Sequence, residues 1–241
     1  MDKEQVYLQP AFLLHQRSYQ NTSAIIDVFT RDFGRFSLVA KGVKRKKSPL
    51  KSVLQSFQPL VLSWVRRSEL GVLTAAELQK PLIRLDHETL YSGLYLNELI
   101  SRVLPPFDTV PELFLSYNEA IFALHGNLSP AVVLRVFERA LLKSLGYEIQ
   151  LRYEADSDKT IEANKYYCYQ PEQGFREIAT DENNALYFKG EHLIAFADNQ
   201  FDKAETRQTA HRLTHMSLSR LLGDKPLESR KLYKAFKAIN P

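Results

Sequence analysis

The spacing of apolar residues changes near Pro81, and this change constrains the fold more than any other feature of the 241-residue chain. Before Pro81, short runs of β-branched and aromatic residues alternate with turn residues, which indicates strands. After it, apolar residues recur at the spacing of about 3.6 residues that an amphipathic helix requires. We therefore expect an α+β chain, with a strand-rich domain at residues 1–80 and a helical domain at residues 81–241.

The strand-rich part contains five apolar runs. Turn residues separate them, such as Asn21-Thr22-Ser23 and Asp32-Phe33-Gly34. Five short strands in about 80 residues fit a five-stranded OB-fold barrel. Periodicity alone leaves an SH3-like barrel open as an alternative. The predicted strands cover residues 11–14, 24–29, 35–40, 60–65 and 71–74.

The helical part begins near Leu90, and its first helix ends at Pro105-Pro106 because proline cannot continue a helix. Short connections between the next two helices indicate a bundle. Residues 150–185 are polar and irregular, and they contain one candidate hairpin at residues 166–178. We expect helices at residues 90–104, 112–124, 130–145, 191–197, 204–222 and 227–238.

Basic residues are concentrated in two regions, although the net charge is only +4. Residues 31–67 hold ten Lys and Arg residues and one acidic residue, Asp32. Residues 203–241 hold nine basic residues against three acidic ones, so the rest of the chain is net acidic. Such an uneven distribution indicates a polyanionic partner.

Several classes of protein are disfavoured. No run approaches the roughly 18 apolar residues of a membrane span, and the polar start Met1-Asp2-Lys3 does not resemble a secretory signal. The single cysteine, Cys168, excludes an internal disulfide framework and favours a cytoplasmic location. We therefore expect a cytoplasmic protein without a membrane partner.

Catalytic and metal-binding signals are also missing. There is no phosphate-binding loop, no nucleophile elbow and no Rossmann glycine set. His211 and His215 lie four residues apart, but no Glu stands beside the first and no third ligand is evident. We expect a non-enzymatic protein that binds neither a metal nor a cofactor.

Four segments, in the same order over nearly the whole chain, resemble the RecO family of bacterial DNA repair and recombination mediators. The first is the run Leu38-Val39-Ala40-Lys41-Gly42-Val43-Lys44-Arg45-Lys46-Lys47, continued by Leu54-Gln55-Ser56-Phe57-Gln58-Pro59-Leu60. The others span residues 90–104, 135–147 and 223–233.

This resemblance implies an N-terminal OB fold, a helical domain, and binding and annealing of single-stranded DNA. It also implies partnership with RecR and contact with the acidic C-terminal tail of single-stranded-DNA-binding protein (SSB). Many members of the family hold zinc with four cysteines after the bundle, and only Cys168 is present here. Since a thiolate zinc site needs about four ligands, the chain resembles the zinc-free members.

The strongest candidate site is the basic loop, which we define as residues 41–51. Clustered cations bind the phosphate backbone without reading sequence. Arg35, Arg66 and Arg67 could extend this track, and Phe36, Phe57 and Trp64 are candidates to stack on bases, although apolar strand residues are more often core. The predicted DNA-binding residues are Arg35, Lys41, Lys44, Arg45, Lys46, Lys47, Lys51, Arg66 and Arg67.

A second candidate site lies on the third predicted helix. Arg135 and Arg139 share a face there, and Leu134 and Leu142 could form an apolar wall beside them. An arginine fork with an apolar pocket suits a peptide that ends in a free carboxylate, which is what the resemblance implies for the SSB tail. A surface Arg135 paired with Glu138 is the alternative interpretation.

We therefore predict a recombination mediator that binds and anneals single-stranded DNA, contacts the SSB tail and works with RecR to load a recombinase. Double-stranded DNA is a further candidate partner, and association with the nucleoid would follow. Two alternatives remain: a protein-only adaptor for acidic partners, and an RNA-binding OB protein. The C-terminal cations, among them Arg230, Lys234 and Lys237, form either a second DNA contact or an ordinary exposed helix face.

Overall fold

The computed structural model describes residues 4–79, 82–155, 157, 159–178 and 187–239. The chain forms two compact units. Unit 1 comprises Met1–Leu128 with Pro226–Pro241, and unit 2 comprises Ser129–Lys225. The predicted domain boundary at residues 80–81 lies outside the described residues, so it stays a prediction.

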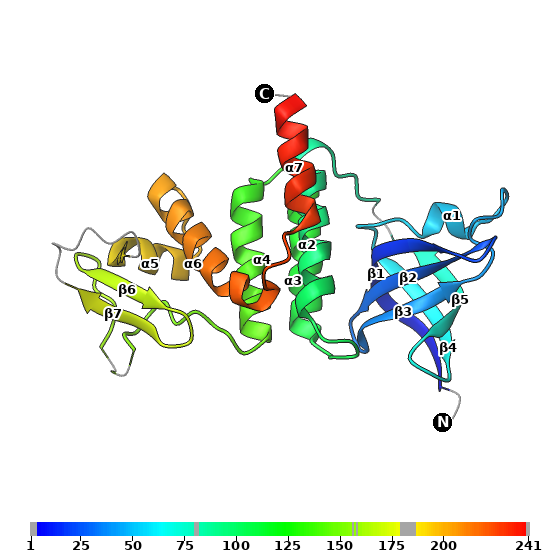
Figure 1. The fold of residues 1–241 in the computed structure, drawn as a ribbon, viewed down its shortest axis with the longest axis horizontal. Coiled ribbons are helices and arrows are strands. Elements are labelled where there is room, and N and C mark those ends of the chain that lie inside the picture. Colours follow the sequence, from blue (N-terminus) through cyan, green and yellow to red (C-terminus); the bar gives the residue numbers. More distant parts are fainter. Residues whose placement is uncertain (1–3, 80–81, 156, 158, 179–186, 240–241) are drawn as a thin grey trace. The chain divides into compact units, whose positions relative to one another are not determined.

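Unit 1 contains five strands in the ring order β1-β2-β3-β5-β4, with β4 pairing back to β1 (Figure 1). All neighbours are antiparallel except β3 and β5, which pair through only Leu38–Gly71 and Val39–Val72. This arrangement confirms the α+β class and the five-stranded OB-type barrel. The elements are β1 (Glu4–Tyr19), β2 (Ser23–Thr30), β3 (Gly34–Ala40), α1 (Leu50–Val53), β4 (Leu60–Arg66) and β5 (Gly71–Leu78).

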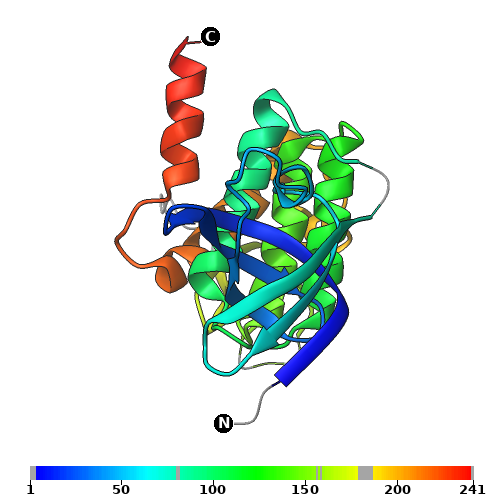
Figure 2. The same cartoon turned by 90° about the vertical axis from the view of Figure 1, so that its right-hand side faces the viewer.

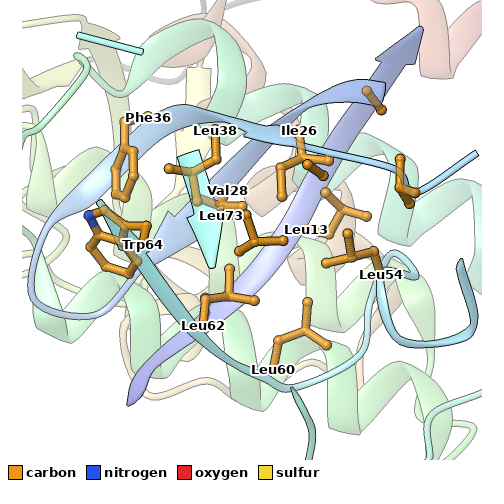
Figure 3. Packing of buried hydrophobic residues seen from close by; sticks show 14 of the residues in the cluster. Leu13, Ile26, Val28, Phe36, Leu38, Leu54, Leu60, Leu62, Trp64 and Leu73 are labelled. Carbon is orange, nitrogen blue, oxygen red and sulfur yellow. The ribbon is translucent and has the colours of Figure 1, made fainter. Parts of the chain in front are cut away.

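The barrel interior is filled by alternate residues of each strand, because successive side chains point to opposite faces. On β2, for example, Ala24, Ile26 and Val28 point inward and are fully buried. Figure 3 shows Trp64 and Phe36 side by side at one end of this core, with their ring centroids 5.1 Å apart. Because apolar side chains fill the interior, any binding surface of the barrel is an outer one.

Strand β1 is much longer than the predicted run at residues 11–14. It extends over Glu4–Tyr19, and its pairing with neighbours shifts between Val6 and Gln9 and between Leu13 and His15. These irregularities place consecutive residues on unexpected faces and break the alternation of apolar and polar residues. The apolar run that predicts a strand is therefore confined to residues 11–14, the buried centre of β1.

Two further helices of unit 1 cover one outer part of the barrel. These are α2 (His87–Val103) and α3 (Pro111–His125), close to the predicted ranges. Phe12 and Phe29, which point outward from paired positions on β1 and β2, pack on Phe114 and Tyr117 of α3. The barrel and these helices thus share one apolar interface.

A buried polar network reinforces this interface. The side-chain amide of Asn97 on α2 donates to the Leu14 carbonyl (2.9 Å), and the hydroxyl of Tyr117 donates to the Asn97 amide oxygen (2.5 Å). Burial raises the pKa of Tyr117, so its hydroxyl stays protonated and able to donate. Gln58, just before β4, makes two hydrogen bonds with the backbone of Ile83. These bonds connect the barrel to the start of the helical segment.

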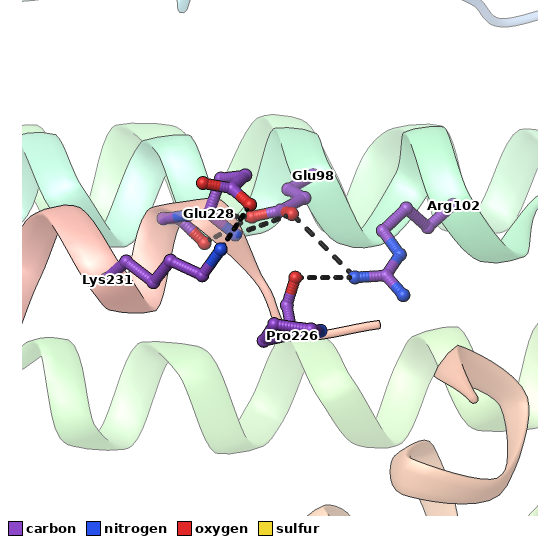
Figure 4. Close-up of polar contacts among 6 residues, drawn as sticks. Glu98, Arg102, Pro226, Glu228 and Lys231 are labelled. Carbon is purple, nitrogen blue, oxygen red and sulfur yellow. Dashed lines mark hydrogen bonds and ion pairs between the residues drawn. The ribbon is translucent and has the colours of Figure 1, made fainter. Parts of the chain in front are cut away.

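The C-terminal helix α7 (Glu228–Ile239) packs on α2. Figure 4 shows the carboxylate of Glu98 at its N-terminus, where it accepts hydrogen bonds from the backbone N–H groups of Glu228 (2.9 Å) and Ser229 (2.8 Å). Arg102 lies 3.8 Å from Glu98 and donates to the Pro226 carbonyl. A carboxylate at a helix N-terminus is favourable because it meets unpaired N–H groups and the positive end of the helix dipole.

Unit 2 combines three helices with a small sheet of order β7-β6-β8. The predicted hairpin is confirmed as β6 and β7, whereas β8 was not predicted; residues 156, 158 and 179–185 of the irregular segment lie outside the described residues. The ranges are α4 (Pro130–Ser144), β6 (Tyr166–Gln170), β7 (Gly174–Ile178), β8 (Tyr187–Lys189), α5 (Gly190–Ala197) and α6 (Ala204–Leu222).

Candidate nucleic-acid interface

The basic loop follows β3 and is built from consecutive turns. Gly42 adopts a positive φ of 70°, which glycine tolerates best. Val43 is buried in the barrel core, and the backbone N–H of Lys44 donates to the Thr22 carbonyl (3.0 Å) in the β1–β2 turn. The short helix α1, which the sequence did not predict, closes the segment. The loop is thus fixed at its base while its side chains are free to point outward.

All six cations of the basic loop are exposed: Lys41, Lys44, Arg45, Lys46, Lys47 and Lys51. Within the described part of the chain, none of them forms an ion pair with an acidic side chain. In Figures 1 and 2 the loop lies at the end of the barrel away from the start of β1. A cluster of unpaired like charges repels itself, and an anionic partner would relieve this repulsion.

The other predicted DNA-binding arginines lie apart from the loop. Arg35 is six strand residues from Lys41, which corresponds to about 20 Å, and its Nε donates to the Leu104 carbonyl (3.0 Å). Burial lowers the pKa of Arg35. Arg66 is 2.6 Å from Glu4 and lies over the Phe107 ring, whereas Arg67 is exposed. Two of these three cations therefore have partners within unit 1.

The aromatic side chains proposed as stacking platforms belong to the core. Phe36, Phe57 and Trp64 are all buried, and Trp64 has no exposed surface. The alternative interpretation, that apolar strand residues are core, is the right one for these three. Bases cannot stack on Phe36 and Trp64 without opening the barrel, or on Phe57 without displacing its ring from Gly93 of α2.

The predicted SSB-tail residues lie on α4 in unit 2. Arg135 is 7% exposed and pairs with Glu138 (2.7 Å), whose side chain is 1% exposed. Arg139 donates to the carbonyls of Phe196 (2.7 Å) and Ala197 (3.2 Å) at the end of α5, and burial lowers its pKa. Leu142 is buried and Leu134 is half-buried. Both guanidinium groups thus already have acceptors within unit 2.

The C-terminal cations differ among themselves. Lys237 pairs with Glu88 (2.8 Å), Lys231 pairs with Glu228 (2.7 Å), and Arg230 lies over the Tyr95 ring. Lys234 is exposed. This surface therefore offers a more neutral face than the basic loop does.

The two histidines of α6 do not belong to a metal-binding cluster of described residues. His211 and His215 stack with their ring centroids 5.9 Å apart on α6. Over the described ranges, no group of three or more His, Cys, Asp or Glu residues could hold a metal ion. Among the same residues, no helix is long and apolar enough to cross a membrane.

Comparisons with known proteins agree over the whole chain. The family described as "Recombination protein O N terminal" matches residues 1–82, and "Recombination protein O C terminal" matches residues 84–231. The chain is 44% identical over 229 residues to "DNA repair protein RecO" of Salmonella dublin, covering 95% of this chain and 94% of the relative. It is 41% identical over 234 residues to the protein of the same name from Nitrosococcus oceani, covering 97% and 95%. The chain belongs to the RecO family of DNA repair and recombination proteins.

Proposed function

We propose that this RecO protein binds single-stranded DNA through the basic loop on its OB barrel. The observation that carries the proposal is the set of six exposed loop cations without an acidic partner in the described part of the chain. Cations that contact phosphates release condensed counterions, which gives binding without sequence preference. Duplex DNA offers the same phosphates and is a second ligand of this surface.

The experiment is a titration of a fluorescent single-stranded oligonucleotide over a series of salt concentrations, without added zinc. The expected result is tight binding that weakens steeply as salt rises. An affinity that does not change with salt would contradict a phosphate-binding loop. Competition with RNA and with an acidic peptide tests the alternatives, an RNA-binding protein and a protein-only adaptor.

The proposed role is that of a mediator rather than an enzyme. Holding two strands on one basic surface favours their annealing because it reduces the repulsion between phosphates. In this proposal the protein also works with RecR to load a recombinase, and it lies in the cytoplasm at the nucleoid. Annealing of complementary oligonucleotides, with and without RecR, is the measurement that follows from DNA binding.

The SSB-tail site at Arg135, Arg139, Leu134 and Leu142 is a separate part of the proposal. An incoming carboxylate would accept from the Nε of Arg135, which is buried and has no hydrogen-bond partner among the described residues, while Glu138 keeps its 2.7 Å contact with Nη2. In this arrangement no buried carboxylate is left without its arginine when the peptide binds. Calorimetry with a tail peptide tests it: Arg135→Ala should weaken peptide binding and leave binding of free DNA intact.

A further inference from the structure

The outer face of β1, β2 and β3 continues beside the basic loop. On β2, Ala24 and Ile26 point into the core, so Ser23 and Ile25 point outward. The register of β1 with β2 pairs Tyr19 with Ser23 and Arg17 with Ile25. Tyr19 and Arg17 therefore lie on the outer face of the barrel.

The helices cover only the opposite part of this face. Phe12 and Phe29 mark the covered part, where they contact α3. From this pair, β1 runs a further seven residues to Tyr19, where it ends beside the β1–β2 turn. Arg17 and Tyr19 are both exposed.

The exposed end of the face adjoins the basic loop. The Thr22 carbonyl in the β1–β2 turn accepts a hydrogen bond from the backbone of Lys44 (3.0 Å). The register pairs Ala24 with Ala40, and Lys41 directly follows Ala40 in the chain. Figure 2 shows this loop at the end of the barrel where β1 finishes. Tyr19 thus stands next to the unpaired cations.

The environment of Tyr19 suits a stacking platform. Its side chain is 36% exposed, and within the described residues its ring has no aromatic partner and its hydroxyl no hydrogen bond. An aromatic ring held by a strand offers a flat apolar surface at little entropic cost. Where cations bind phosphates, such a ring is the natural partner for an unpaired base. Farther along this face, the Asp27 carboxylate accepts a hydrogen bond from Ser37. This acidic side chain marks where the basic part of the face ends.

We propose that Tyr19 stacks on a base of bound single-stranded DNA while Arg17 and Lys41 hold the adjacent phosphates. This inference rests on the proposed function and adds to it a preference for single-stranded over duplex DNA. Bases in a duplex already stack on one another and are not available to Tyr19, whereas phosphates are available in both forms. Tyr19 therefore gives the barrel its preference for single strands, and the loop cations give affinity for both.

The test compares oligothymidylate with an abasic oligonucleotide of the same length, which carries the phosphates without the bases. Tyr19→Ala should weaken binding of oligothymidylate about tenfold and leave abasic binding unchanged. Tyr19→Phe should retain wild-type affinity because the ring remains. Tyr7→Ala is the matched control, since Tyr7 lies on the same strand, is 62% exposed and is far from the loop; it should change neither affinity.

The salt series separates this inference from the proposed function. Tyr19→Ala should keep the wild-type salt slope, because no phosphate contact is lost. If the wild-type protein binds no DNA, the proposed function fails and this inference fails with it. If the wild-type protein binds but Tyr19→Ala binds oligothymidylate as tightly, only the stacking assignment is overturned. Equal losses on both oligonucleotides would also overturn it.

Discussion

The cations of the basic loop differ from the ion-paired cations of unit 2. In the loop, six cations are exposed and have no acidic partner among the described residues. In unit 2, Arg152, Lys189, Lys203 and Arg220 pair with nearby carboxylates, and Arg135 is buried against Glu138. The total number of basic residues is therefore a poor guide to a DNA site. What distinguishes the loop is that its charges are not neutralised within the protein.

The largest effect is expected from removing the loop charges. Replacing Lys44, Arg45, Lys46 and Lys47 by Ala should weaken binding of single-stranded DNA by roughly 100-fold at low salt. The plot of log affinity against log salt should also become shallower by about 3 units if all four side chains contact phosphates. Fluorescence anisotropy over a salt series measures both quantities.

A matched control removes the same number of charges from unit 2. Arg152, Lys189, Lys203 and Arg220 are exposed or half-exposed, and each has a carboxylate partner. Replacing these four by Ala lowers the net charge equally. Their loss should leave DNA affinity nearly unchanged if pairing decides which cations bind. An equal loss of affinity in both quadruple variants would show that only net charge matters.

The buried pair on α4 provides the next largest effect. Arg135→Ala leaves the Glu138 carboxylate in a buried site without its arginine, which should lower the free energy of unfolding by about 3–5 kcal/mol. Urea denaturation measures this change. The double variant Arg135→Met with Glu138→Leu should recover most of the loss, because no buried charge remains. If Arg135→Ala is as stable as the wild type, the pair is not buried in solution.

The same double variant separates folding from peptide binding. It should fold, yet it lacks the guanidinium that the proposed SSB-tail site requires. Loss of peptide binding in a stable double variant would support Arg135 as the carboxylate partner. Full peptide affinity would remove Arg135 from that site while leaving the DNA-binding proposal untouched.

The sequence predicted elements better than side-chain environments. The strands and helices follow from local periodicity, and their bounds agree with the structure except at β1, α1, β5 and β8. Strand β5 continues to Leu78, four residues beyond its predicted range. The burial of Arg135 does not follow from periodicity, because it depends on which residues pack around α4. The only sequence signal for the ion pair was Glu138, three residues after Arg135. Trp64 and Phe36 were ambiguous for a similar reason, since a strand pattern does not say which face closes into a barrel. Tyr19 follows the apolar run of β1 and precedes a turn, so periodicity gave no reason to select it.

Changes in the neutral hydrogen-bond network of Asn97 and Tyr117 should lower the free energy of unfolding less than loss of the Arg135–Glu138 pair does. Asn97→Ala removes the amide that serves the Leu14 carbonyl and the Tyr117 hydroxyl. Because these buried groups then lack a hydrogen-bond partner, the free energy of unfolding should fall by about 2–3 kcal/mol. Tyr117→Phe removes one hydrogen bond and keeps the ring, so it should cost about 1 kcal/mol. Denaturant unfolding gives both values, and equal costs would mean that the Leu14 contact contributes nothing.

The smallest effect is expected at Glu98, whose nearest contacts are hydrogen bonds from Ser229 and Glu228, with Arg102 farther away at 3.8 Å. Burial disfavours its charged form, but the hydrogen bonds from Ser229 and Glu228 prevail and hold the pKa of Glu98 below its usual value. A carboxylate whose pKa is lower in the folded state stabilises the fold above its unfolded pKa, near 4.3. That contribution is lost as the pH falls through the lower folded value. Protonation then loosens the N-terminus of α7 from α2.

Glu98→Gln tests this assignment because it keeps the size of the side chain and removes its titration. The wild type should lose more stability than the variant between about pH 5 and pH 3, and the two curves should converge at the acidic end. Thermal denaturation over this range gives the difference. Parallel curves for the two proteins would mean that Glu98 does not hold α7, and that this helix is kept in place by Tyr91 against Tyr233 and Phe236.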